Sequence, residues 1–395
     1  MKLTPWRRVV AITVPAATLA TVLMMLGIEA WVRSTWDARQ GEPDFYVADT
    51  RRGQKLGAGY DGWFAGVPVK INQLGFRDDR EYALAKGPRT FRILVLGDSV
   101  TFGHGSVFKH TYPYLLEQQL REWRPEVDWQ VWNLGVPGYN TRQEWAYLTE
   151  VATAYAPDLV IVGFFPNDVI GNVLPPPESA VTAARSRMLS WVRAHWYSAE
   201  WYRRAYLTLR WQGTASEGEK RRLAALSAED RPTPHGGAVA DAEAQQLTPF
   251  ETWTADQVSA ITCPSGSKPG TEGADNLQRE ASWPDFVDAV RSLQAMQTSG
   301  AVRLMFFLNT APPVCLDGDF FYDGGYSYVN NLFLDVMGRG ALAISSFDAF
   351  LPLRPSQMPN AGGHSLGNAN VIKASVLSAY LRTSVLPPLL TEKAP

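Results

Sequence analysis

Ser99 follows an apolar run at the point where the chain has to turn. The stretch from Phe91 to Gly105 reads FRILVLGDSVTFGHG, in which strand-forming residues lead directly into Gly97, Asp98 and Ser99. A serine in this place can cap a helix, or it can be a nucleophile exposed on a strand-to-helix turn, with backbone amides nearby for an oxyanion. A phosphate cradle is the third interpretation, but neither the P-loop pattern nor the dinucleotide fingerprint is present. The triplet alone does not separate a cap from a nucleophile.

Two further apolar runs end in residues that can stabilise an oxyanion. The stretch NLGVPGYNT contains Gly138, whose backbone N–H can approach a ligand, and GFFPNDV contains Asn167, which offers a side-chain amide, and Asp168. Each feature by itself is also an ordinary turn or cap. Because the carboxyl ends of parallel strands share one edge of a sheet, Ser99, Gly138 and Asn167 are expected to converge there.

A serine nucleophile needs a base, and His364 is the best placed histidine. It lies in AGGHSLGNANVIKASVLSAYL, where a loop after the last apolar run leads into a C-terminal helix that can return it over the strand ends. Two histidines follow Ser99 too closely to face it easily, although the first of them is not dismissed, and two lie in the middle of the chain. These four are His104, His110, His195 and His235.

Strand and helix patterns alternate along most of the chain. Apolar strands are expected at RILVLGDS, DWQVWNLGV, DLVIVGFF, VRLMFFLN and ALAISSFDAF. Helical periodicity lies between them in TYPYLLEQQLREW, in TRQEWAYLTEVATAY with Asn140 as its cap, and in WPDFVDAVRSLQAM. This alternation predicts a three-layer α/β/α sandwich with a mostly parallel, five-stranded, flavodoxin-like sheet.

The alternation is interrupted once, which divides the chain into segments. We expect an anchor at 1–31, a stalk with an edge strand at 32–85, a catalytic domain at 86–174 and 277–385, and a helical, partly disordered insertion at 175–276. Val69, Ile71 and Leu74 mark the edge strand. In the insertion, an aromatic helix from Arg185 to Gln212 is expected over the catalytic domain, where it shapes the acceptor side, rests near the membrane, or packs away from the site.

The N-terminus reads as a membrane anchor. Lys2, Arg7 and Arg8 precede an uncharged, mostly apolar run from Val9 to Ile28, which is long enough to cross a bilayer. A cleaved signal peptide is the alternative, but its apolar core is shorter and GIEAW is a poor cleavage site. The charge distribution predicts a single-pass protein of the bacterial inner membrane, with a periplasmic or extracellular body.

Cysteine usage and net charge narrow the function classes. Cys263 and Cys315 are the two cysteines, and export predicts that they form a disulfide, with two buried free thiols as the alternative. We expect no metal and no cofactor, because no cysteine or histidine spacing supports a metal site. The net charge of −2 gives no basic field for nucleic acid.

Taken in order, these motifs resemble those of the SGNH or GDSL hydrolase family. Gly97-Asp98-Ser99 matches its first block, NLGVPGYNT with Gly138 its second, Asn167-Asp168 its third, and His364 with its following helix its fifth. The resemblance covers roughly 69–173 and 282–382, and the lead-in VKINQLGFRD is similar to that of membrane-anchored bacterial members. It implies Ser99 as nucleophile, Gly138 and Asn167 as oxyanion donors, and His364 as general base.

Two positions depart from the family pattern. The third block reads FFPND, so only its Asn-Asp part matches, and Ala361 stands where the family carries the aspartate three residues before the histidine. The base is therefore expected to work in a dyad, with a neutral acceptor such as Asn360 or a backbone carbonyl. Asp348 is the alternative third member, and Asp98 and Asp168 are further candidate supporting residues.

The sequence thus predicts a serine esterase that cleaves an O-acyl or O-acetyl ester through an acyl-enzyme. The substrate is an acylated small molecule or an envelope or exported polysaccharide, because the body is expected outside the inner membrane. An O-acyltransferase that uses the same acyl-enzyme is the first alternative. A degenerate, non-catalytic glycan-binding domain is the second, and Ala361 is its main support.

Overall fold

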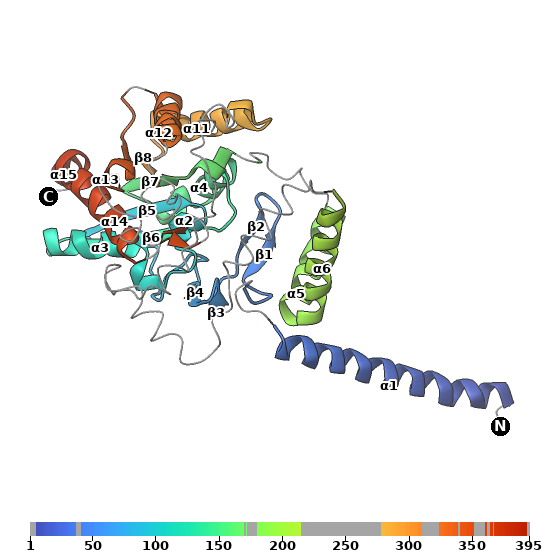
Figure 1. Cartoon of the computed structure of the whole chain (residues 1–395). Helices are drawn as coiled ribbons and strands as arrows, with labels where there is room; N and C mark the ends of the chain where they lie inside the picture. Colours follow the sequence, from blue (N-terminus) through green and yellow to red (C-terminus); the bar gives the residue numbers. More distant parts are fainter. Residues whose placement is uncertain are drawn as a thin grey trace, which may run out of the picture.

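A parallel five-stranded sheet forms the centre of the body (Figure 1). The computed structural model describes residues 5–36, 41–169, 171, 180–214, 278–309, 324–338, 340–350, 360–361, 364–365 and 367–392. The strand order is β6-β5-β7-β8-β9, and every neighbouring pair is parallel. The strands are β5 (Thr90–Gly97), β6 (Asp128–Gly135), β7 (Leu159–Phe164), β8 (Leu304–Leu308) and β9 (Ala343–Ser345). The predicted sheet is confirmed.

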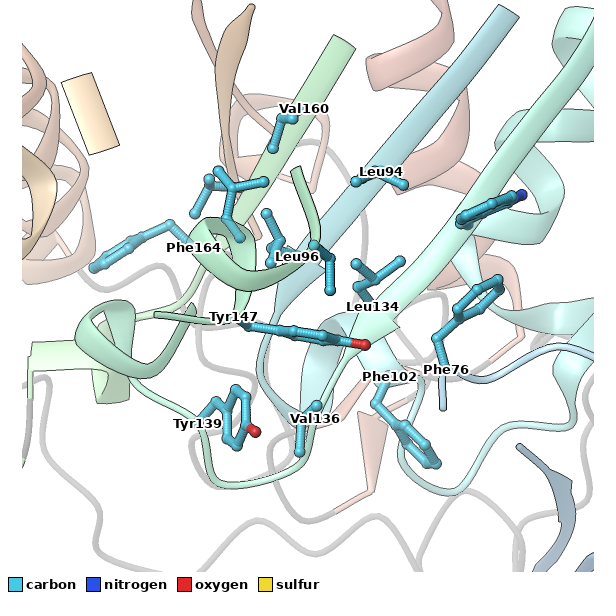
Figure 2. Packing of buried hydrophobic residues seen from close by; sticks show 14 of the residues in the cluster. Phe76, Leu94, Leu96, Phe102, Leu134, Val136, Tyr139, Tyr147, Val160 and Phe164 are labelled. Carbon is cyan, nitrogen blue, oxygen red and sulfur yellow. The ribbon is translucent and has the colours of Figure 1, made fainter. Parts of the chain in front are cut away.

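The central strand β5 is buried along its whole length. Strands covered on both faces read as continuous apolar runs, which is why FRILVLG carries no polar alternation. Side chains of successive residues point to opposite faces, so Leu94 and Leu96 belong to one core cluster, whereas Ile93 and Val95 belong to the other. Figure 2 shows part of the first cluster, in which Leu94 and Leu96 of β5 lie with Tyr147 among the labelled residues.

Helices cover both faces of the sheet, as predicted for a three-layer sandwich. The first cluster is completed by α4 (Thr141–Tyr155), α11 (Trp283–Thr298) and α12 (Gly324–Met337). The second is completed by α3 (Tyr112–Trp123), α14 (Asn368–Tyr380), a π-helical turn (Leu381–Val385) and α15 (Leu386–Glu392). Asn140 caps α4 with a capping box, as expected.

The order of the strands creates a switch point at the carboxyl end of β5. The chain moves from β5 through α3 to β6 on one side, and then through α4 to β7 on the other side of β5. In open α/β sheets, ligands bind at this place because the connections diverge there. Ser99 comes two residues after β5 and therefore lies at this switch point.

A short strand is present at Val69, as expected, but it includes neither Ile71 nor Leu74 and is not an edge of the five-stranded sheet. Two separate hairpins precede the sheet, β1 (Tyr46–Asp49) with β2 (Gly53–Leu56) and β3 (Asp61–Phe64) with β4 (Val67–Lys70). Val69 pairs with Gly62, and within the described residues of this segment a single isolated bridge, from Arg77 to Asn133, reaches the main sheet. Ala65 and Gly66 join β3 to β4 with positive φ angles of 52° and 76°, as a tight two-residue hairpin turn requires. This local turn pairs the strand that contains Val69 with β3 and not with the main sheet.

The expected aromatic helix from 185 to 212 is two helices. They are α5 (Ala180–His195) and α6 (Tyr197–Thr214), and Trp196 separates them. Both lie beside β1 and β2 in Figure 1, where α5 contacts β1 and α6 contacts α1. The prediction of one continuous helix is therefore wrong, although the helical character of the region is confirmed.

The N-terminal helix α1 (Pro5–Ser34) extends away from the body (Figure 1). Its segment Ala11–Ser34 has a mean hydropathy of 2.0 and is long and apolar enough to cross a membrane, a property that a signal sequence shares. His235 and the cysteines Cys263 and Cys315 lie outside the described residues, so the disulfide stays a prediction.

Candidate active site

Asp98, and not Ser99, is the helix cap of the GDS triplet. The Asp98 carboxylate accepts a hydrogen bond of 2.8 Å from the backbone N–H of Val100 and so begins the short helix α2 (Ser99–Phe102). Ser99 is the first residue of this helix, and amides of a first turn have no helical acceptor. The Ser99 hydroxyl is consequently not consumed by capping.

The turn that presents Ser99 tolerates only glycine at position 97. A Cβ atom there would lie 2.0 Å from Thr101 Oγ1 and 2.8 Å from the carbonyl oxygen of Gly163. Thr101 is in turn held by Tyr112, with 2.8 Å between the two hydroxyl oxygens. The first glycine of the triplet thus allows β5, β7 and α2 to pack closely beneath the nucleophile.

His364 lies within hydrogen-bond distance of Ser99, with 2.8 Å between Nε2 and Oγ. It is carried by β11 (His364–Ser365), which pairs with β10 (Asn360–Ala361), and Ala361 is the register partner of His364. The structure therefore brings together two residues that are 265 positions apart in the sequence. A serine hydroxyl that donates to an imidazole nitrogen has the geometry required for proton transfer.

A second histidine stacks on His364. The rings of His104 and His364 are 4.3 Å apart between centroids, with 24° between their planes, and Phe64 contacts His104 edge-on. Burial lowers the pKa of His104 to about 3, and the charges of His364 and Arg77 act in the same direction. His104 is therefore neutral at physiological pH. The sequence did not predict this contact, because His104 was considered only as a residue that could face Ser99, not as a neighbour of His364.

Arg77 fixes the loop that carries His104. Its guanidinium is fully buried and donates to the carbonyl oxygens of Phe102 and Gly103 at 2.8 Å each and of Ser106 at 2.5 Å. Burial lowers the pKa of Arg77 to about 9. Five planar donors suit an arginine to such a cluster of carbonyls. Sequence reasoning missed this role, because nothing in the lead-in VKINQLGFRD separates Arg77 from an ordinary polar residue.

Asn167 reaches the nucleophile turn through Asp98. Its Nδ2 donates to Asp98 Oδ2 at 3.0 Å, and Ser99 Oγ lies 3.4 Å from the same oxygen. Asn167 belongs to a short 3₁₀ helix, η3 (Pro166–Val169), directly after β7. Since an amide group has two N–H donors, one of them remains for another acceptor at this edge.

Gly138 lies in the turn that follows β6. The Val136 N–H donates to the carbonyl oxygen of Gly97 at 2.9 Å, and the Tyr139 N–H closes the turn onto Val136. Gly138 is exposed, has a φ of +82°, and has only Gln54 Nε2 near the position of a Cβ, at 3.8 Å. The turn is thus bonded to the Ser99 turn and leaves the Gly138 backbone accessible.

Two buried carboxyl groups lie behind this edge. Glu144 of α4 and Asp168 of η3 are both fully buried. Neither oxygen of Glu144 has a hydrogen-bond partner within the part of the chain that the structure describes. Burial raises the pKa of Glu144 well above its ordinary value, with the charge of Asp98 adding to it, and burial and the charge of Glu144 do the same to the pKa of Asp168. Both effects favour the protonated, uncharged form of these carboxyl groups.

Asp348 and Asn360, the other candidates for supporting His364, lie on different elements. Asp348 is an exposed residue of α13 (Phe347–Phe350), and no hydrogen bond or ion pair involves it among the described residues. Asn360 lies on β10 and pairs in register with Ser365, one residue after the base. A buried lysine, Lys373 of α14, was not predicted; burial lowers its pKa to about 7, and the charge of Asp98 opposes this effect.

The described residues hold no metal-ligand cluster, and one cavity that they form lies away from this edge. The described residues contain no group of three or more histidine, cysteine, aspartate or glutamate side chains that could hold a metal ion. A cavity of about 540 Å³ lies at the opposite end of the sheet, where Leu159 and Leu304 begin β7 and β8. This cavity is separate from Ser99, Gly138 and Asn167, which follow the carboxyl ends of β5, β6 and β7.

A protein-family model matches the part of the chain that contains three of these site residues. The family model described as GDSL-like lipase/acylhydrolase matches residues 95–258. This range contains Ser99, Gly138 and Asn167. His364 lies outside the range, and the fold brings it within hydrogen-bond distance of Ser99. No protein among the curated sequences matches the chain.

Solved structures give low similarity over most of the chain. An α/β hydrolase from the metagenome of Lake Arreo, Spain, is 14% identical with a TM-score of 0.38, over 75% of this chain and 96% of the other. A catalytic mutant of an acetylxylan esterase from Geobacillus stearothermophilus is 16% identical with a TM-score of 0.36, over 74% and 93%. A two-domain esterase active on acetylated mannans is 11% identical with a TM-score of 0.34, over 78% and 51%.

Proposed function

We propose that the chain is an ester hydrolase of the GDSL-like lipase/acylhydrolase type, whose family model matches residues 95–258, and that Ser99 and His364 are its catalytic dyad. The observation that carries this proposal is the distance of 2.8 Å between Ser99 Oγ and His364 Nε2 at the switch point of the sheet. A second observation supports it: Asp98 caps α2, so the Ser99 hydroxyl remains available.

The reaction follows from this geometry. Ser99 Oγ attacks the acyl carbonyl carbon while its proton moves to His364 Nε2, which gives a tetrahedral oxyanion and an imidazolium. The C–O bond to the alcohol then breaks, and the alcohol leaves with the proton from Nε2. Water attacks the acyl-enzyme in the same way, so that the products are a carboxylic acid and an alcohol, and Ser99 regains its proton.

Three donors are proposed for the oxyanion. They are the backbone amides of Ser99 and Gly138 and the Nδ2 group of Asn167, which follow β5, β6 and β7 respectively. The hydrogen bond from Asn167 to Asp98 fixes the amide in place before the substrate binds. Donors fixed in advance stabilise developing charge without reorganisation, which is the largest contribution in many acyl transfers.

The dyad works without a carboxylate at position 361. Ala361 lies opposite His364 in the β10–β11 register, so the side chain that occupies the family's aspartate position cannot accept a proton or orient the ring. The stacked, neutral ring of His104 restricts the imidazole instead. A dyad of this kind stabilises imidazolium less than a triad does, and slow hydrolysis of generic esters is expected.

We further propose that α1 anchors the enzyme in the inner membrane and that the body acts outside it. The length and hydropathy of Ala11–Ser34 support the anchor, and Arg7 and Arg8 before it support export of the body. An O-acyl group on a small molecule or a polysaccharide outside that membrane is the proposed substrate. Transfer of the acyl group to a sugar hydroxyl, in place of water, uses the same intermediate.

Mass spectrometry of the intact chain after incubation with a fluorophosphonate tests the dyad. The wild type is expected to gain one adduct, and Ser99→Ala is expected to gain none. An unlabelled wild type that is folded, or labelling that persists in Ser99→Ala, would contradict the proposal. Acetate release against transfer to an added sugar then separates hydrolysis from transfer.

A further inference from the structure

The end of α1 is bonded directly to the turn between α5 and α6. The Glu29 carboxylate accepts hydrogen bonds from the backbone N–H groups of Tyr197, at 3.0 Å, and Ser198, at 2.9 Å. Arg33 donates to the carbonyl oxygen of His195 at 2.9 Å. The first amides of α6 and the last carbonyl of α5 have no helical partners, so α1 supplies both missing groups. The last turns of α1 and the α5–α6 hairpin (Ala180–Thr214) therefore form one unit.

Aromatic side chains surround this junction. Trp31 of α1 meets Trp201 of α6 edge-on at 6.4 Å between centroids, and Trp36 meets Tyr197 edge-on at 5.0 Å. The Arg33 guanidinium lies 4.3 Å from the centre of the Tyr197 ring. Tryptophan and tyrosine gather at membrane–water interfaces because their rings are amphipathic, and arginine accompanies them there. The body-side end of the apolar helix thus carries an interfacial composition.

One side of the α5–α6 hairpin packs on the body. Ser190 of α5 accepts a hydrogen bond of 3.3 Å from the Ala48 N–H of β1, and Arg204 of α6 donates to the carbonyl oxygen of Gly41 at 3.3 Å. Glu200 is buried on this side and is paired with Arg203 and Arg204. This inner side is polar and satisfied, so it fixes the hairpin against β1 and β2.

The other side of the hairpin is apolar and exposed. Eight large side chains on it are between 41% and 80% exposed: Val181, Met188, Leu189, Trp191, Trp201, Tyr202, Tyr206 and Leu209. Positions 181, 188 and 191 recur with helical spacing, which keeps them on one side of α5. Single exposed apolar residues are ordinary, but a group of this size marks an interaction surface. Arg185 and Arg187 are exposed on the same helix.

We propose that this exposed face of the α5–α6 hairpin rests on the surface of the lipid bilayer that α1 crosses. The inference rests on the proposed anchoring through α1. Its argument is continuity, because the hairpin is bonded to the last turns of the span and lies across the direction in which α1 leaves the body (Figure 1). A bilayer that accepts α1 must therefore meet the hairpin.

The chemistry of the face fits a lipid interface. Tryptophan, tyrosine, leucine and methionine would enter the boundary between headgroups and acyl chains, while Arg185 and Arg187 would contact anionic headgroups. A protein partner on this face would have to occupy the space next to the span that lipid fills. Contact at both α1 and the hairpin holds the body at a fixed height and orientation, which a single helix with a free joint does not do.

Lipid-dependent fluorescence quenching of the full chain tests the proposal. The chain is inserted into vesicles of phosphatidylcholine and phosphatidylglycerol at three to one, with or without bromine on the acyl chains. A fluorophore is attached at Met188→Cys or Leu209→Cys on the exposed face, and at Arg291→Cys on α11 as the matched control, where the native side chain is 72% exposed. The unsubstituted chain gives the labelling background from Cys263 and Cys315.

Brominated lipid is expected to quench the labels at 188 and 209 at least about twofold more than the label at 291. Equal quenching at the three positions, in a chain that floats with the vesicles, would overturn the inference and leave the anchoring intact. A chain that does not float at all would overturn the anchoring and this inference together. Hydrolysis of a soluble ester by each labelled chain shows that the dyad is unaffected, so neither result bears on the esterase assignment.

Discussion

Ser99 follows the central strand of a five-stranded sheet, whereas His364 is carried by a strand pair of only two residues on each side. The backbone before Ser99 is paired on both sides, with β6 and with β7, and its turn is closed by the Asp98 cap. The His364 ring stacks on His104, which belongs to a distant loop. The nucleophile is therefore held by regular structure and the base by tertiary packing, so substitutions around the two should act differently.

Removing either member of the dyad should have the largest effect. Ser99→Ala removes the attacking oxygen and His364→Ala removes the proton acceptor, so each should lower kcat for hydrolysis of p-nitrophenyl acetate by about 10⁴-fold or more. The double variant should be no worse than either single variant, because the two residues act as one unit. Retention of more than about a tenth of the activity in folded His364→Ala would show that another group is the base.

The next largest loss of activity is expected at Asn167, the proposed oxyanion donor on the nucleophile side. Asn167→Ala should lower kcat by about 10²–10³-fold with little change in KM, because the lost hydrogen bond forms only in the transition state. Asn167→Asp keeps the shape of the side chain but offers no N–H donor, so it separates loss of the donor from loss of volume. A change confined to KM in both variants would remove Asn167 from the proposed oxyanion site.

The same contrast explains what could be predicted from the sequence. The apolar runs of the five strands, the Asn140 cap and the positions after strand ends are local patterns, and the fold that they predicted is confirmed. The break between α5 and α6 is set by Glu29, which is 168 positions from Tyr197, while the local pattern is helical on both sides. The stack of His104 on His364 likewise depends on a loop held by Arg77. Such contacts are made by distant segments and leave no periodic signal.

The base side can be tested through His104. His104→Ala should lower kcat by about tenfold, because it leaves space beside an imidazole on a short strand pair, whereas His104→Phe should lose less than about threefold because it keeps a ring in the stack. Equal losses in the two variants would mean that the stack itself is not what matters.

His104 also has a predicted effect on acid stability. Its folded pKa of about 3 lies below the unfolded value of 6.5, so the stability it contributes is complete above pH 6.5 and is lost as the pH falls toward 3. A phenylalanine cannot take up a proton, and His104→Phe should therefore resist acid better than the wild type between these values. Circular dichroism during acid titration measures the difference.

The buried carboxyl pair behind the nucleophile gives a smaller, pH-dependent effect on stability. The folded pKa of Glu144 is raised, so its contribution is complete below the unfolded value of 4.5 and is lost as the pH rises through the folded value. A glutamine at this position cannot ionise, so the stability of Glu144→Gln relative to the wild type should be greater at pH 8 than at pH 5. The expected difference in unfolding free energy is about 1.4 kcal/mol for each unit of pKa shift. Urea unfolding at the two pH values measures it, with exposed Glu122→Gln as the control. A gain in stability that is the same at both pH values would contradict a raised pKa of Glu144.

The smallest effect is expected at Asp348, the carboxylate that the sequence offered as a third member of the site. It is exposed on α13 and makes no hydrogen bond or ion pair among the described residues, whereas a triad carboxylate must hold the imidazole. Asp348→Asn should therefore change kcat/KM by less than about tenfold, or ~1.4 kcal/mol, when it is measured beside His364→Ala on the same ester. A loss as severe as that of His364→Ala, in a chain whose unfolding transition is unchanged, would make Asp348 a true third member. His364 would then be held by a carboxylate after all, and the contrast between a nucleophile fixed by the sheet and a base fixed by ring stacking would fail.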